Sequence, residues 1–167
     1  MRQVTLSFLI KKNNNGKIAG VWLAMKKRGF GKDKWNGCGG KLDPKKGDKK
    51  ILDTLLRENR EEIGIKVKKA EKVAIIDFIF PNNRKFNGWN QRVHVFLISE
   101  WTGSPKESEE MKPTFFQVDR MPYTAMWDDD VFWLPAVIVG KKIRARCLFD
   151  RSLKTRHFEI KMAVKPL

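Results

Sequence analysis

The stretch that follows residue 50 carries the pattern that most restricts how this chain can fold. Apolar side chains recur there at the three- and four-residue spacing of one helix face, and a glycine suited to a helix C-terminus follows them. The apolar positions are Ile51, Leu52, Leu55, Leu56 and Ile63, and the glycine is Gly64. The sequence therefore predicts an amphipathic helix from about residue 50 to residue 63.

Three carboxylates belong to this predicted helix. Glu58, Glu61 and Glu62 stand at positions i, i+3 and i+4, so their side chains share one helix face. Their mutual repulsion would be removed by a hard divalent cation, because Mg²⁺ prefers carboxylate oxygens and keeps waters for a phosphate ligand. A solvated acidic face with salt bridges is an equally good interpretation of these three residues alone.

A glycine-rich segment precedes the helix and favours the metal interpretation. Residues 29–48 contain too many glycines for regular structure, so we expect a long loop, and long loops in compact domains are often functional. Its centre reads Trp35-Asn36-Gly37-Cys38-Gly39-Gly40-Lys41. Backbone without side chains can approach phosphates and metal, and Lys41 supplies a positive charge.

The rest of the chain is dominated by strand patterns. A second helix is predicted at 130–140, after the acidic run of Asp128, Asp129 and Asp130, and a polar loop at 101–113. The predicted strands are 3–10, 18–26, 66–80, 91–99, 114–118, 143–149 and 155–164. With 167 residues and no visible linker, we expect one domain over residues 1–167.

Composition indicates the cellular compartment of the protein but does not identify its ligand. Two cysteines without metal-ligand spacing, and no apolar run of the roughly 18 residues that a membrane span needs, favour a cytoplasmic protein without a membrane partner. The net charge of +16 attracts polyphosphates and nucleic acids, but the lysines are dispersed and are equally compatible with a solvated surface. No basic sheet face interleaved with aromatic residues is apparent, so we expect no stable nucleic-acid partner. We also expect a monomer.

Loop and helix together resemble the Nudix hydrolase family, whose signature is G-x5-E-x7-R-E-U-x-E-E-x-G-U with U a bulky aliphatic residue. Gly40, Arg57-Glu58, Glu61-Glu62 and Gly64-Ile65 match that signature. The likeness is greatest to members that act on oxidised purine nucleoside triphosphates, and it covers all but the last 20 or so residues and an insertion at 79–90. It rests on Met25 to Gly31, Trp35 to Gly37, His94 to Phe96, Glu109 to Pro113, Met126 to Asp130 and Trp133 to Pro135.

The sequence departs from the signature at two points. The loop is three residues longer than the family pattern, most naturally around Pro44 to Lys46, which puts Lys49 at the position of the loop glutamate with Asp48 beside it as the better acid. Asn59 stands where the family has an aliphatic residue. The identity of the loop acid is therefore open.

The resemblance implies a Nudix fold of the α/β (α+β) class, with a mixed β-sheet between helices and a loop-helix-loop that carries the metal site. It implies Mg²⁺-dependent hydrolysis, with Mn²⁺ able to substitute, of oxidised purine triphosphates such as 8-oxo-dGTP and 2-oxo-dATP to the monophosphate and pyrophosphate. The implied metal ligands are the Gly39 carbonyl, Glu58, Glu61 and Glu62. Glu61 and Glu110 are the implied candidates for the base, with Arg57 orienting Glu61.

The resemblance also implies a nucleobase pocket. The implied substrate-binding residues are Thr5, Lys26, Phe30, Asn36, Lys41, Phe78, Trp127, Asp129 and Asp130, with Trp133 as a further wall. Two adjacent carboxyls near an apolar wall should couple, so that one stays protonated and can donate a hydrogen bond. Core tryptophans and a helix N-cap are the competing interpretation, and Cys38, His94 and His157 are expected to be structural.

Three other functions stay open at this point. The substrate could be a dinucleotide polyphosphate or a capped RNA, since the positive charge favours a longer anion. A non-catalytic nucleotide or RNA sensor with the same fold is the third, because the loop acid is altered.

Overall fold

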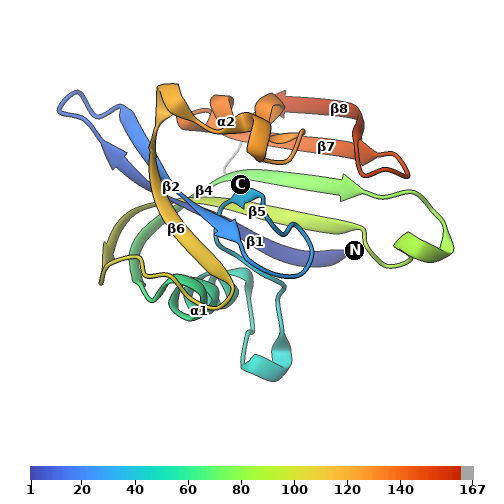
Figure 1. The fold of residues 1–167 in the computed structure, drawn as a ribbon, viewed down its shortest axis with the longest axis horizontal. Coiled ribbons are helices and arrows are strands. Elements are labelled where there is room, and N and C mark those ends of the chain that lie inside the picture. The colour runs from blue at the N-terminus through green and yellow to red at the C-terminus, as the bar shows by residue number, and fades with distance from the viewer. Residues whose placement is uncertain (163–167) are drawn as a thin grey trace.

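The computed structural model describes residues 1–162, which form one eight-stranded sheet and two α-helices (Figure 1). The strands are β1 (Arg2–Lys12), β2 (Ile18–Lys26), β3 (Trp35–Asn36), β4 (Lys66–Ile79), β5 (Gln91–Thr102), β6 (Met111–Gln117), β7 (Ile143–Phe149) and β8 (Thr155–Met162). The helices are α1 (Ile51–Ile63) and α2 (Asp130–Ile138).

The sheet is mixed. Its order is β3-β2-β1-β5-β4-β7-β8, and β6 pairs with β2 beside this path. The β1–β5 and β4–β7 pairs are parallel, and the remaining pairs are antiparallel. The parallel β1–β5 pair places segments that are far apart in the sequence side by side at the centre of the sheet.

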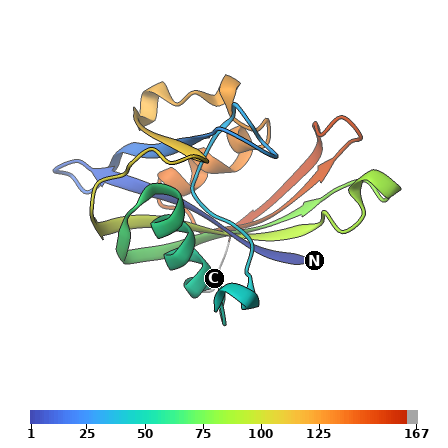
Figure 2. The same cartoon turned by 60° about the horizontal axis from the view of Figure 1, so that its bottom comes forward.

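The helices lie on opposite faces of the sheet, α2 above it and α1 below its left half (Figures 1 and 2). Each covers its own apolar cluster. Trp133, Leu134 and Val137 of α2 pack against one face, while Leu55 and Ile63 of α1 pack against the other. The predicted mixed sheet between helices is thereby confirmed.

Helix α1 begins and ends where its sequence predicts. The Asp53 carboxylate accepts hydrogen bonds from the backbone N–H groups of Lys49 and Lys50, at 2.9 and 3.0 Å, which satisfies groups that the first turn leaves without partners. Gly64 follows the last turn with a φ of 73° and donates its N–H to the Arg60 carbonyl at 3.2 Å.

Several predicted boundaries shift. Strand β6 begins at Met111, so Met111 to Pro113 belong to a strand and not to the predicted loop; the proline is tolerated because β6 pairs only with β2 within residues 1–162. Strand β5 runs on to Thr102, and α2 ends at Ile138 instead of residue 140. Residues 163 and 164 of the last predicted strand lie outside the described residues.

The glycine-rich loop runs along β1 and carries the site. Backbone hydrogen bonds join Thr5 to Gly40 at 2.9 Å and Ser7 to Cys38 at 2.7 and 3.0 Å. A Cβ atom on Gly39 would overlap the Thr5 carbonyl, and one on Gly40 would overlap the Glu58 carboxylate. Glycine is required at both positions because the loop passes between β1 and the acidic face of α1.

Candidate active site

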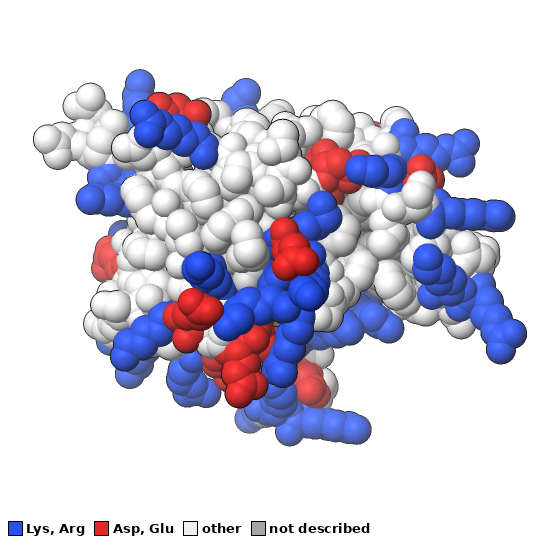
Figure 3. Space-filling view, viewed as in Figure 1, with Lys and Arg blue, Asp and Glu red and all other residues white. Residues whose placement is uncertain are grey.

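The acidic face of α1 opens onto a groove that we call the carboxylate groove. Its charged lining residues are Lys26, Arg28, Lys41, Asp43, Lys46, Arg57, Glu58, Glu61, Glu62, Glu109 and Glu110. The three helix carboxylates therefore share one face, as their spacing predicts, and Glu110 joins them from the segment before β6. Figure 3 shows acidic side chains gathered below the middle of the molecule, whereas Lys and Arg side chains are spread around that face.

Glu62 is the buried glutamate of the groove. Its side chain is 6% exposed, accepts a hydrogen bond from the Gly39 N–H at 2.9 Å, and lies 3.9 Å from the Lys26 ammonium. Burial raises the pKa of Glu62 to about 7, because the neutral form loses less on leaving water. A cation placed beside this carboxylate would displace its proton.

Glu61 and Glu58 are held by positive side chains. The Lys46 ammonium lies 3.0 Å from Glu61, and the Arg57 guanidinium contacts Glu61 at 3.1 Å and Glu58 at 2.7 Å. The hydrogen bond from Lys46, together with Arg57, lowers the pKa of Glu61. The predicted contact between Arg57 and Glu61 is present, but Lys46, from the three-residue loop extension, is an additional partner that the sequence did not reveal.

Asp48 is the acid that joins the loop to α1. Its carboxylate accepts from Arg57 Nε at 3.0 Å and from Arg57 Nη2 at 2.7 Å, and both side chains are buried. Lys49, which the family spacing puts at the loop-glutamate position, is exposed. The buried Asn59 amide also has a hydrogen-bond partner, since it donates to Ser7 Oγ at 2.9 Å.

A divalent cation fits this groove chemically. Within residues 1–162 no three acidic, histidine or cysteine side chains converge on one point, since Glu58 and Glu61 contact Arg57 and Lys46. The available donors are nonetheless all oxygens, and one belongs to the buried Glu62 carboxylate, whose contact with the Lys26 ammonium is long at 3.9 Å. This donor set suits a hard ion such as Mg²⁺.

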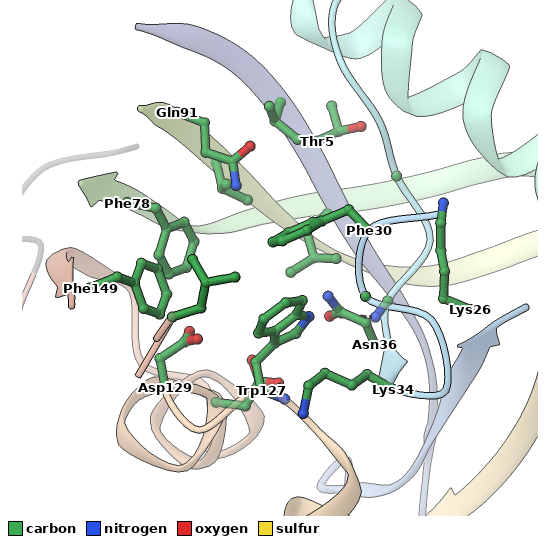
Figure 4. Close-up of a pocket in the computed structure, with 18 of the residues that line it drawn as sticks. Thr5, Lys26, Phe30, Lys34, Asn36, Phe78, Gln91, Trp127, Asp129 and Phe149 are labelled. Carbon is green, nitrogen blue, oxygen red and sulfur yellow. Dashed lines mark hydrogen bonds between the residues drawn. The ribbon is translucent and has the colours of Figure 1, made fainter. Parts of the chain in front are cut away.

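An apolar cavity of about 200 Å³ adjoins the groove (Figure 4). Its lining includes eight of the predicted substrate-binding residues: Thr5, Lys26, Phe30, Asn36, Phe78, Trp127, Asp129 and Asp130. The ninth, Lys41, lines the carboxylate groove instead. We call this cavity the base pocket, because its aromatic walls and few polar groups suit a planar heterocycle.

Two buried aspartates form the polar edge of the base pocket. Asp129 accepts from the Trp133 indole N–H at 3.1 Å, and Asp130 accepts from the Trp127 backbone N–H at 3.1 Å. Burial raises the pKa of Asp129 to about 6 and that of Asp130 well above its usual value. Burial and the neighbouring carboxylate favour protonation within this pair, so that one of the two aspartates can donate a hydrogen bond. Asp129 does occupy the N-cap position of α2, but its side chain makes no capping hydrogen bond there.

Trp127 and Phe30 form the aromatic wall. Their rings stack with centroids 5.0 Å apart, and the Lys34 ammonium lies 5.2 Å from the indole centroid. The Phe30 ring, 51% exposed, also meets Trp89 edge-on at 5.2 Å. Trp133, by contrast, is fully buried, so it belongs to the core as well as to the pocket lining.

Sequence reasoning missed several residues that line these cavities. Lys34, Gln91, Phe80, Phe149 and Leu153 line the base pocket, and Arg28 and Lys46 line the groove. A strand-end position such as that of Gln91 or Phe149 carries no local signal, because only the sheet order brings those ends together. Cys38 is buried in the α1-side core, as expected for packing. His94 is buried, with Nε2 2.8 Å from the Gln3 amide oxygen, and His157 is exposed on β8.

Comparisons with known proteins agree with this geometry. The family model for the NUDIX domain matches residues 1–136. The chain is 42% identical over 122 residues to a Mus musculus protein named oxidized purine nucleoside triphosphate hydrolase, covering 73% of this chain and 74% of that one. It is 38% identical to a Danio rerio protein of the same name, with the same coverage.

The fold is similar to the crystal structure of a MutT protein from Bacillus halodurans. The TM-score is 0.77 at 22% identity, with 96% of this chain and 98% of that chain covered. Strands β7 and β8 lie beyond the matched family model, yet β7 pairs with β4 of the common sheet. That residues 1–167 form one domain stays a prediction.

Proposed function

Because this chain belongs to the Nudix hydrolase family, we propose that its substrate is a nucleoside triphosphate, preferably an oxidised purine such as 8-oxo-dGTP or 2-oxo-dATP. The products are the nucleoside monophosphate and pyrophosphate. The observation that carries this proposal is the base pocket with its Asp129–Asp130 edge, which opens directly onto the carboxylate groove. The names of the mouse and zebrafish relatives support the same substrate class.

Recognition of the base rests on three polar groups. Asn36 Oδ1 accepts from the Gly37 N–H at 2.8 Å, which leaves the amide N–H groups for a ligand. Burial raises the pKa of both aspartates, so that one can carry a proton and donate while the other accepts, at neighbouring atoms of a ring stacked beside Trp127. Oxidation of a purine changes donors and acceptors on its edge, so these groups favour the oxidised base by hydrogen bonding and not by size.

Nudix hydrolases use divalent metal ions, and we propose Mg²⁺ here, with Mn²⁺ as a substitute, held by Glu58, Glu61, Glu62 and the Gly39 carbonyl. When bound, the ion neutralises phosphate oxygens and favours attack by water. Arg57 holds the carboxylates of Glu58 and Glu61 toward the groove.

The groove's other charged side chains act on phosphate and water. Lys26 and Lys41 supply positive charge for phosphate oxygens. Glu61 and Glu110 are the two candidates to accept the proton of the attacking water; both have a lowered pKa and are ionised at neutral pH, Glu110 through its 2.6 Å contact with Arg28.

The setting proposed for the enzyme is the cytoplasm. Both cysteines are free and buried, which supports a reducing compartment. Neither helix of residues 1–162 has the length and apolar character to cross a membrane. Action as a monomer on free nucleotides, with no nucleic-acid partner, stays a prediction.

The test is a pyrophosphate-release screen with Mg²⁺ over 8-oxo-dGTP, 2-oxo-dATP, unmodified dGTP, a dinucleotide polyphosphate and capped RNA. Oxidised purine triphosphates should give the highest kcat/KM, and Glu58→Gln and Glu62→Gln should each lower kcat roughly 10²-fold. Glu100→Gln, an exposed glutamate on β5 outside both cavities, is the matched control. Faster turnover of capped RNA or the dinucleotide would contradict the substrate assignment, and near-normal rates in both groove variants would contradict the assignment of the carboxylates.

A further inference from the structure

The base pocket and the carboxylate groove meet at a common border. Five residues line both cavities: Val4, Lys26, Phe30, Gly39 and Gln91. In every nucleotide the sugar joins the base to the phosphates. If the base occupies the pocket and the phosphates occupy the groove, as the proposed function requires, the sugar lies at this border.

The other four border residues are less suited than Gln91 to bind a sugar hydroxyl. Val4 and Phe30 are apolar. The Lys26 ammonium lies between the carboxylates of Glu62 and Glu110, at 3.9 and 3.7 Å, on the phosphate side of the border. Gly39 already donates its N–H to Glu62. Gln91 is therefore the border side chain that offers both a donor and an acceptor to a sugar.

Gln91 is well placed for this contact. It is the first residue of β5 and pairs with Arg2 of β1 on one side and Phe78 of β4 on the other, so strands on both sides hold its backbone. Its half-buried side chain projects into the cavity between Phe78 and Thr5 (Figure 4).

The Gln91 amide is also available. The next polar side chains on β5 already have hydrogen-bond partners: Arg92 pairs with Asp77 at 2.7 Å, and His94 contacts Gln3. The Gln91 amide forms no comparable hydrogen bond within residues 1–162.

We propose that Gln91 hydrogen-bonds the 2′-hydroxyl of the sugar and sets the preference of this enzyme between ribo- and deoxyribonucleotides. The proposal rests on the proposed function and extends it, since it names the residue that distinguishes the sugar of the substrate. A site that bonds a hydroxyl disfavours the analogue without it, because the amide is then left without its partner.

The experiment compares kcat/KM for 8-oxo-GTP and 8-oxo-dGTP in the wild type and in Gln91→Met. Methionine has nearly the shape of glutamine without its hydrogen-bonding groups, so the variant keeps the packing of β5. The ratio of kcat/KM for the ribo over the deoxy substrate should fall roughly three- to tenfold, the equivalent of one partly exposed hydrogen bond. The loss should fall on 8-oxo-GTP, with 8-oxo-dGTP nearly unchanged.

Two comparisons make the result decisive. Gln117→Met removes the same amide from an exposed position on β6 outside both cavities and should leave the ratio unchanged. Gln91→Glu keeps an acceptor in the same place and should retain part of the ribo preference.

The proposal is overturned if Gln91→Met changes both substrates equally or leaves the ratio unchanged. Failure of the proposed function would be visible separately and first, as a wild type that hydrolyses neither nucleotide, and would remove this inference with it.

Discussion

The ion pair between Asp48 and Arg57 offers the sharpest test of how the loop is attached to α1. The two side chains are 2% and 7% exposed and form two parallel hydrogen bonds of 2.7 and 3.0 Å. Asp48 also accepts from Thr54 Oγ1 at 2.9 Å and from the Asp43 N–H at 3.0 Å. One carboxylate thus connects the loop, the first turns of α1 and the arginine that holds the groove glutamates.

Replacing Asp48 by Asn should be strongly destabilising. Removal of one partner from a buried ion pair costs about 3–5 kcal/mol, and the lower end applies here because Arg57 keeps its contacts with Glu58 and Glu61. For a chain of this size each kcal/mol lowers the thermal midpoint by roughly 2–4 °C, so a fall of about 6–12 °C is expected. Thermal unfolding followed by circular dichroism at neutral pH, without metal, measures it.

The difference in stability between the wild type and Asp48→Asn should depend on pH in a definite direction. Arg57 holds the pKa of Asp48 well below its usual value, so this stabilisation is present above the unfolded pKa of about 3.9 and is lost as the pH falls toward the folded value. The difference in thermal midpoint between the wild type and Asp48→Asn should therefore become smaller at acidic pH. Lys49→Gln is the control, since Lys49 is the exposed neighbour at the family's loop-acid position. A midpoint within about 2 °C of wild type for Asp48→Asn, or an equal loss in Lys49→Gln, would refute the reasoning.

Two further predictions concern charged side chains of the base pocket and of the carboxylate groove. Burial raises the pKa values of Asp129 and Asp130, so their protonated forms favour folding, and stability should fall as the pH rises from about 4 through about 6. The Asp130→Asn variant has no carboxyl group at this position, so its free energy of unfolding, measured with urea, should fall less than that of the wild type between roughly pH 4 and 8. An unchanged pH dependence would contradict this prediction. Lys46 contacts Glu61, so Lys46→Met should tighten Mn²⁺ binding at low salt by roughly three- to tenfold, measured by calorimetry. Lys45→Met removes the same charge from the same turn without that contact, and an equal effect in both variants would show that only net charge matters.

Local features of this protein could be predicted from its sequence because their causes are local. The period of the apolar residues between 51 and 63 and the glycine at 64 define α1 within about a residue, since both act through the helix itself. The spacing of Glu58, Glu61 and Glu62 puts three carboxylates on one face for the same reason. The strand patterns and the family signature likewise predict the mixed sheet between two helices.

The tertiary structure decided which of these features meet. Lys46 lies 15 positions from Glu61, and their contact depends on how the extended loop folds back over α1. The choice of Asp48 over Lys49 depends on which side chain the loop turns inward to Arg57. Gln91 reaches the site because β5 lies between β1 and β4 in the sheet, so that a strand start, the glycine-rich loop and the base pocket share one border. Such contacts depend on strand order and loop path, which are set by the packing of the whole sheet and not by any one segment.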